Sequence, residues 1–134
     1  MADEILKFTK LAFAINFVIG LIYTILYWLP ELNTSLYGVT YTELVGALSW
    51  LIGSCMIGLT LGSLFSIFAK EWKEVRIVAI ISITVNIAFL ITLTLTLSVF
   101  NELVYVAVVA IIILLVLYCL SFLQQEDTIK NLWK

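Results

Sequence analysis

The sequence predicts an all-α, polytopic membrane protein, a bundle of four transmembrane helices that forms one domain over residues 1–134. Hydrophobic residues make up 63% of the chain and charged residues only 12%, against about 45–50% and about 25% in a typical soluble protein. A globule of this size cannot bury so much apolar surface. In addition, the charges divide the chain into four uncharged apolar stretches, each long enough to cross a hydrocarbon core of about 30 Å at about 1.5 Å per residue.

The four predicted spans follow from the positions of the charges. They cover residues 11–29, 44–69, 77–99 and 103–123. The loop at residues 100–102 is so short that the third and fourth spans must form an antiparallel hairpin, and the loop at 70–75 is almost as short. Only residues 30–42 leave room for an additional element, which we expect to be an amphipathic turn on the membrane surface.

The orientation follows from the basic residues, because Lys and Arg in short loops stay on the cytoplasmic side. All seven lie in the N-terminal segment, in the loop between the second and third spans, or in the C-terminal segment: Lys7, Lys10, Lys70, Lys73, Arg76, Lys130 and Lys134. We therefore expect a multi-pass protein of the plasma membrane with both termini in the cytoplasm. Trp72 and Tyr118 are expected in the aromatic belt at the cytoplasmic interface.

The second span carries a stripe of small residues, including a GxxxG pair. Its members share one helix face: Ala47, Ser54, Gly58, Gly62 and Ser66. Small residues at this spacing let helix backbones approach closely in lipid. The stripe predicts a helix-packing interface, either within this bundle or at a seam with a second copy or another subunit. Gly46 and Gly53 form a second groove on the same span, so we expect partners on both of its sides.

Polar side chains recur at membrane depth in the first and third spans. These are Asn16 in the first span and Ser82, Thr84 and Asn86 in the third. Amides are costly when they face lipid, so both asparagines should face protein or water. They either hold helices together by interhelical hydrogen bonds or line a polar cavity that serves an ion or a small solute.

Three acidic residues lie near span ends on the predicted outer side: Glu31, Glu43 and Glu102. The run from Thr40 to Glu43 fits a capping box at the start of the second span, and Asn101 followed by Glu102 fits a cap at the fourth. Negative charge at a helix N-terminus is favourable by itself. The alternative is an acidic mouth that attracts cations or a basic partner.

Metal, cofactor and nucleic-acid sites are not expected. The chain has no histidine, only two cysteines and a net charge of −2. Cys55 and Cys119 are predicted at different depths, beyond disulfide reach, and are expected to be apolar packing residues. No carboxylate pair stands out for acid–base catalysis, so we do not expect an enzyme.

Residues from Glu43 to about Ala88 combine a glycine-rich span, a short charged loop with Trp72 and Arg76, and a further span. In this pattern the chain resembles small four-span membrane proteins of bacteria and archaea that are loosely DoxX-like. The resemblance implies the membrane fold and no particular activity.

These observations favour a structural or interaction role. The chain would associate with itself or act as an accessory subunit of a membrane complex, with membrane lipids and other membrane subunits as its partners. The alternative is a small oligomeric transporter or channel for an ion or a small solute, in which Asn16 and Asn86 face a polar cavity.

Overall fold

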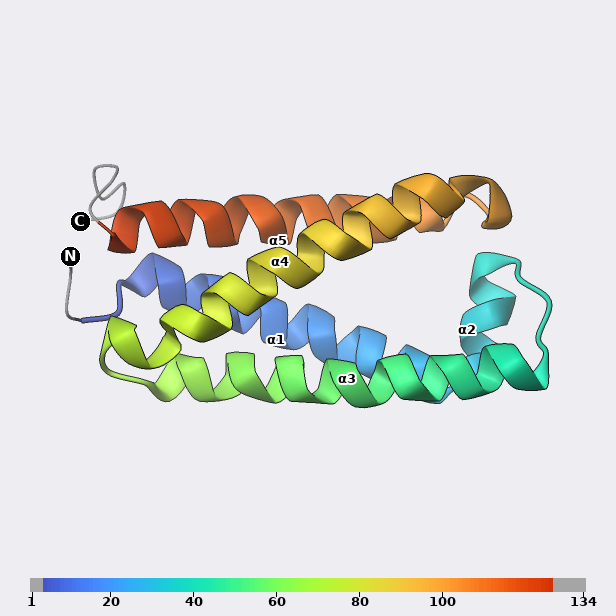
Figure 1. Ribbon diagram of the computed structural model, residues 1–134, viewed down its shortest axis with the longest axis horizontal. Helices are drawn as coiled ribbons and strands as arrows, with labels where there is room; N and C mark the ends of the chain where they lie inside the picture. The colour runs from blue at the N-terminus through green and yellow to red at the C-terminus, as the bar shows by residue number, and fades with distance from the viewer. Residues whose placement is uncertain (1–3, 127–134) are drawn as a thin grey trace.

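The computed structural model describes residues 4–126, and helices make up nearly all of this range (Figure 1). In chain order the elements are α1 (Lys7–Trp28), α2 (Pro30–Tyr37), α3 (Glu43–Phe68), α4 (Trp72–Thr96), the short 3₁₀ helix η1 (Leu97–Val99) and α5 (Val104–Gln125). Four helical segments are long and apolar enough to cross a membrane: α1, α3, α4 together with η1, and α5. The predicted all-α bundle of four transmembrane helices is confirmed.

The transmembrane helices extend beyond the apolar stretches where charged residues continue the helix. The N-terminal helix α1 starts at Lys7, and α4 starts at Trp72, inside the predicted charged loop. A capping box fixes the start of α4, because the side chains of Glu71 and Glu74 each accept from the other's backbone N–H. The connection between α3 and α4 is therefore shorter than the charge pattern suggests.

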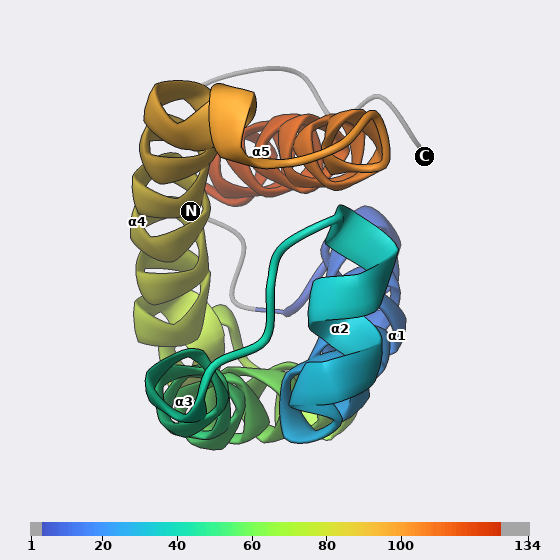
Figure 2. The same ribbon diagram turned by 90° about the vertical axis from the view of Figure 1, so that its right-hand side faces the viewer.

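The four long helices form a ring in which α4 runs obliquely (Figures 1 and 2). It begins beside the C-terminal end of α3 and ends over α5, while α1 lies along α3 and also contacts α5. We call the half of the bundle that holds the start of α1 and the end of α5 the terminal half. The opposite half, which is capped by α2, is the α2 half.

The terminal half has a closely packed apolar core. Its buried residues are Ile5, Phe13, Trp72, Val75, Ala79 and Tyr118. The rings of Phe13 and Tyr118 pack edge to face with centroids 5.5 Å apart. Trp72 is only 2% exposed and Tyr118 is fully buried. The two side chains therefore pack against neighbouring helices and do not face lipid, so the expectation that they form part of an aromatic belt needs correction in this respect.

Hydrogen bonds close the terminal half around the end of α5. The Gln125 Oε1 accepts from the Leu6 backbone N–H at 3.1 Å and from the Thr9 hydroxyl at 3.2 Å. The Gln125 Nε2 donates to the Glu4 carbonyl at 2.7 Å. We call these bonds the terminal clasp. They tie the end of α5 to the segment that leads into α1.

Beside the clasp, Glu126 joins the end of α5 to the start of α4. Its Oε1 accepts from the Trp72 Nε1 at 2.7 Å and pairs with the Arg76 Nε at 2.9 Å. Three of the four transmembrane helices are thus bonded together at this end.

The α2 half is held by its own contacts. Pro30 starts α2, and Gly38 ends it with a φ of 70°, a left-handed conformation that glycine adopts without strain. The Asn101 side chain donates to the Leu36 carbonyl at 2.7 Å, and the Asn101 backbone N–H donates to the Tyr37 carbonyl at 3.0 Å. These bonds tie α2 to the turn that precedes α5.

Two predicted caps can be compared with the structure. Helix α3 is capped by the hydroxyl of Thr42, which accepts from the Val45 N–H at 3.2 Å, so the cap lies two residues after the predicted Thr40. Asn101 caps the turn before α5, because its Oδ1 accepts from the Leu103 N–H at 3.0 Å. The predicted surface turn in residues 30–42 is the helix α2.

Candidate functional site

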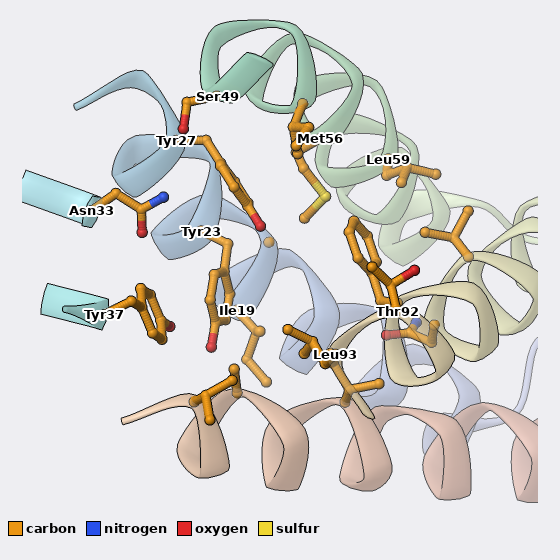
Figure 3. A pocket seen from close by; sticks show the side chains of 18 of the residues that line it. Ile19, Tyr23, Tyr27, Asn33, Tyr37, Ser49, Met56, Leu59, Thr92 and Leu93 are labelled. Carbon is orange, nitrogen blue, oxygen red and sulfur yellow. The ribbon is translucent and has the colours of Figure 1, made fainter. Parts of the chain in front are cut away.

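A cavity of about 350 Å³ occupies the centre of the α2 half (Figure 3). This volume lies within the range of small-molecule pockets, about 300–1,000 Å³. All five α-helices contribute to its walls, which are mainly apolar, and Met56 points inward from α3. No Asp, Glu, Lys or Arg is among the described residues that line it.

The cavity exists because the helices pair unevenly. Close contact between α1 and α3 comes from small and polar residues, since the Thr24 and Thr60 hydroxyls lie 3.4 Å apart and a side chain at Gly20 would meet the Thr60 hydroxyl at 2.6 Å. Helix α4 leaves α3 and follows α5 instead (Figure 1). The space between the two helix pairs therefore widens toward α2.

Polar side chains from all four transmembrane helices meet at the floor of the cavity. We call this group the polar centre; it consists of Asn16, Ser63, Ser82, Asn86 and Tyr118. The Asn16 Nδ2 donates to the Ser63 hydroxyl at 2.6 Å, and the Asn86 Nδ2 donates to the Ser82 carbonyl at 2.7 Å. The Tyr118 hydroxyl lies close to the side chains of Asn16, Ser63 and Ser82.

Two hydroxyls of the polar centre have no direct hydrogen-bond partner in the described chain: Ser82 Oγ and Tyr118 Oη. Their residues are 3% and 0% exposed. Of the two residues, only Ser82 lines the cavity. Leaving a buried polar group unsatisfied costs about 1–3 kcal/mol, so a partner from outside the chain would stabilise the Ser82 hydroxyl. Asn16, Ser82 and Asn86 line the cavity, which places this bonding capacity where a ligand can use it.

Three tyrosines surround the end of the cavity nearest α2. Tyr23 and Tyr27 project from α1 and Tyr37 from α2 (Figure 3). On α4 the lining residues from Asn86 to Thr96 span ten residues, or about 15 Å along the helix axis. The cavity is therefore elongated, with polar groups at both ends and apolar walls between them.

The structure brings together three of the four residues predicted to form a polar cavity. Thr84 does not belong with them. It is exposed on the outside of α4, where its hydroxyl donates to the Ile80 carbonyl at 2.9 Å. Two residues after Ser82, it lies about 200° further around the helix, so this part of the prediction needs correction.

Sequence reasoning missed Ser63 and Tyr118. Ser63 lies in a span that was read for its stripe of small residues, of which it is not a member. It is three residues from Thr60 and shares its helix face. Tyr118 was assigned to the interface because it lies near the predicted cytoplasmic end of the fourth span. A signal existed in Tyr118 and Ser121, which place polar groups one turn apart on α5.

The small-residue stripe of α3 is divided between two environments. Ala47, Ser54 and Gly58 are exposed on the outside of the bundle, and a Cβ at Gly58 would meet nothing within 4 Å. Within this stripe, only Gly62 and Ser66 face a neighbouring helix of this chain. A Cβ at Gly62 would lie 3.6 Å from the Val78 side chain, and Ser66 is buried. As an interface within the bundle, the prediction therefore needs correction for the first three residues.

The face of α3 that packs on α1 is instead formed by Gly53, Thr60 and Ser63. A Cβ at Gly53 would collide with the Trp28 ring. Gly53 belongs to the second groove that the sequence indicates. Close packing of α3 in this bundle thus relies on that groove, which is on the far side of the helix from Gly58.

The three acidic residues predicted at the outer side are exposed, and none of them lines the cavity: Glu31, Glu43 and Glu102. Glu43 lies in the first turn of α3, where its charge is favourable. Cys55 and Cys119 are exposed and are not joined by a disulfide. No cluster of possible metal ligands occurs within residues 4–126.

No protein-family model, no curated protein and no solved structure matches the chain. The resemblance to DoxX-like proteins stays a prediction, and the function has to be argued from the cavity itself.

Proposed function

We propose that this protein binds a small, uncharged, amphipathic molecule in the central cavity and carries it within or across the membrane. One observation supports this most directly: the polar centre lies at the floor of a cavity that is otherwise apolar. Ligand sites usually combine apolar walls with a few convergent polar groups. This proposal develops the transporter alternative that Asn16 and Asn86 indicate in the sequence.

The chemistry of the walls favours an uncharged ligand over an ion. A charge in a low-dielectric environment needs a partner charge or dense hydrogen bonding. The described residues that line the cavity supply only amides, hydroxyls and apolar groups. These groups donate to and accept from a neutral hydroxyl, carbonyl or amide without a net charge on either side.

A carrier, rather than an open channel, fits the difference between the two ends of the bundle. The terminal half is closed by the aromatic core and the clasp, while the α2 half holds the cavity. Beyond the polar centre, Ser121 Oγ and both amide atoms of Gln124 are buried with no hydrogen-bond partner within residues 4–126. They would offer polar contacts to a ligand when the terminal half opens.

We further propose that the terminal half faces the cytoplasm and that the protein resides in the plasma membrane. Lys7, Lys10, Lys70 and the two basic residues at the start of α4, Lys73 and Arg76, lie at the terminal end, which is the arrangement that the positive-inside rule favours. In this orientation the cavity lies toward the outer side.

The binding proposal can be tested with 1-octanol, which is uncharged, and with octylammonium, which has the same chain and a charge. We expect octanol to raise the thermal unfolding midpoint of the purified protein in detergent and octylammonium to leave it unchanged. Asn86→Leu should remove the octanol effect, because it removes an amide from the cavity floor. Thr84→Leu is the matched control, since Thr84 faces outward from the same helix.

An octanol effect of equal size in wild type and Asn86→Leu would contradict the proposal, because it would come from the detergent micelle. No effect in the wild type would also contradict it.

A second candidate function is self-association or attachment to another membrane subunit, the role that the sequence favours. The exposed part of the small-residue stripe, Ala47, Ser54 and Gly58, supports it. Gly58→Leu should then give a smaller species in detergent that stays folded. An unchanged size relative to the wild type would count against this role.

A further inference from the structure

The position of the residues that line the cavity shows where it opens. Among the lining residues, three are exposed on the outside of the bundle: Leu48 and Ile52 on α3 and Thr92 on α4. The exposed fractions of Leu48 and Ile52 are 49% and 37%. No lining residue of α1, α2 or α5 is exposed. The opening therefore lies on the side of the bundle, between α3 and α4.

The opening lies at the depth of lipid chains. Leu48 and Ile52 follow the start of α3 by five and nine residues, or about 7 and 13 Å along the helix axis. The 26 residues of α3 extend about 39 Å, against a hydrocarbon core of about 30 Å. Both side chains therefore lie within the hydrocarbon region.

The opposite side of the cavity is covered. Helix α2 lies between α1 and the turn that leads into α5 (Figure 2), and the bonds from Asn101 to Leu36 and Tyr37 hold it there. The asymmetry is part of the fold, since α3 and α4 are joined tightly at the terminal end and separate toward α2 (Figure 1).

We infer that the cavity is loaded sideways from the lipid, between α3 and α4, and that its ligand is a membrane-dissolved, uncharged amphiphile with a single alkyl chain. This inference rests on the proposed function and names its ligand class. The head group, a hydroxyl, carbonyl or amide, bonds at the polar centre, where Ser82 Oγ lacks a partner. The chain lies along Leu48 and Ile52 and reaches the lipid through the opening.

The energetics agree with a ligand of this class. Lipid chains are as apolar as leucine side chains, so an alkyl chain gains little by moving from lipid into the cavity. Selection must then come from the head group, which exchanges its hydrogen bonds at the membrane interface for bonds to the amides and the hydroxyl that line the cavity floor. The distance of about 15 Å from Asn86 to Thr96 is half the hydrocarbon thickness and matches one chain of one leaflet.

The test uses the full-length protein in phosphatidylcholine bilayers and electron paramagnetic resonance. The probes are stearyl alcohol and stearic acid, each with a nitroxide on the chain, at a pH that ionises the acid. A third probe, the water-soluble uncharged nitroxide TEMPOL, reports loading from water. A probe held in the cavity gives a motionally restricted component that differs from fluid lipid.

We expect a restricted component of about one alcohol per chain, and at least threefold less with the acid. Val85→Trp, which fills the cavity from α4, should reduce it at least threefold. Ile87→Trp is the matched control, because Ile87 is 45% exposed on the outside of the same helix and should leave the component unchanged.

Each of the following outcomes would contradict either the inference of loading from the lipid or the proposed binding function. A restricted component that is equal for alcohol and acid, or that survives Val85→Trp, is lipid at the outer surface and overturns the inference. Restriction of TEMPOL alone, lost in Val85→Trp, overturns the membrane source and leaves the proposed binding function standing. Absence of restriction for every probe, together with no stabilisation by octanol, overturns both.

Discussion

The terminal half and the α2 half of this bundle are built from similar helices but are stabilised differently. In the terminal half an aromatic core fills the space between the helices, and Gln125 uses both of its amide atoms in hydrogen bonds. In the α2 half the helix pairs separate, and the polar centre keeps hydroxyls without partners. The terminal half is closed by its core and its clasp, although Ser121 and Gln124 have polar atoms without a partner among the described residues. The α2 half has an open cavity with bonding capacity for a ligand.

The difference shows what packing means within lipid. Water does not drive these helices together, so close contact depends on shape, dispersion and polar bonds. Where these are present, as between Phe13 and Tyr118, the helices meet. Where α4 departs from α3, nothing forces the gap to close, because lipid or a ligand can fill it. The cavity is therefore compatible with a stable fold.

The largest expected effect comes from breaking the terminal clasp. Gln125→Leu removes three hydrogen bonds to Leu6, Thr9 and Glu4, and we expect it to lower the free energy of unfolding by about 3 kcal/mol. Gln124→Leu is the matched control. Among the described residues the buried Gln124 amide has no hydrogen-bond partner, so its loss should leave stability unchanged or raise it in an SDS titration.

Equal losses of stability in the two glutamine variants would mean that the clasp is not what closes the terminal half. The carrier proposal, which requires the terminal half to be closed, would then lose this support.

The next effect concerns the pairing of α1 with α3, on which one wall of the cavity depends. Gly20→Leu places carbon atoms where the Thr60 hydroxyl lies, 2.6 Å from the new Cβ, and overpacking of this kind costs about 1–3 kcal/mol. Gly58→Leu meets open space and should leave the unfolding free energy of the chain unchanged. A fold as sensitive to Gly58→Leu as to Gly20→Leu would show that the outer face of α3 is packed.

The smallest effect separates bonded from unbonded groups within the polar centre. Ser63→Ala removes the acceptor of the Asn16 amide and should cost about 1 kcal/mol. Ser82→Ala removes a hydroxyl without a partner and should be neutral or slightly stabilising while weakening the octanol effect. Loss of stability in Ser82→Ala, with octanol binding unchanged, would assign that hydroxyl a purely structural role.

The fold could be predicted because a single property dominates it. Uncharged runs between Lys10, Pro30, Glu43, Lys70 and Arg76 leave few alternatives to transmembrane helices. The orientation of helix faces was harder to predict. Two small-residue grooves lie on α3, and local sequence cannot decide which one α1 uses; that depends on how Gly20 and Thr60 fit together.

The candidate site was predictable in part for a similar reason. Asn16, Ser82 and Asn86 are conspicuous as amides and hydroxyls in apolar spans, and they do meet. Tyr118 was missed because its position near the predicted cytoplasmic end of the fourth span suggested an interface. The tilt of α4, which opens the cavity, depends on how all the helices pack together and cannot be predicted from the sequence of any single span.

The most direct test compares the same substitution in the two halves. Ala79 lies in the terminal core at 1% exposure, and Ala107 lines the cavity at 5% exposure. Each would be replaced by leucine, and the free energy of unfolding would be measured in bilayers by steric trapping. Ala79→Leu should lose about 1–3 kcal/mol through overpacking, whereas Ala107→Leu should keep or slightly gain stability because its side chain enters open space. Equal destabilisation by the two substitutions would contradict the account, since it would mean that the α2 half is as closely packed as the terminal half.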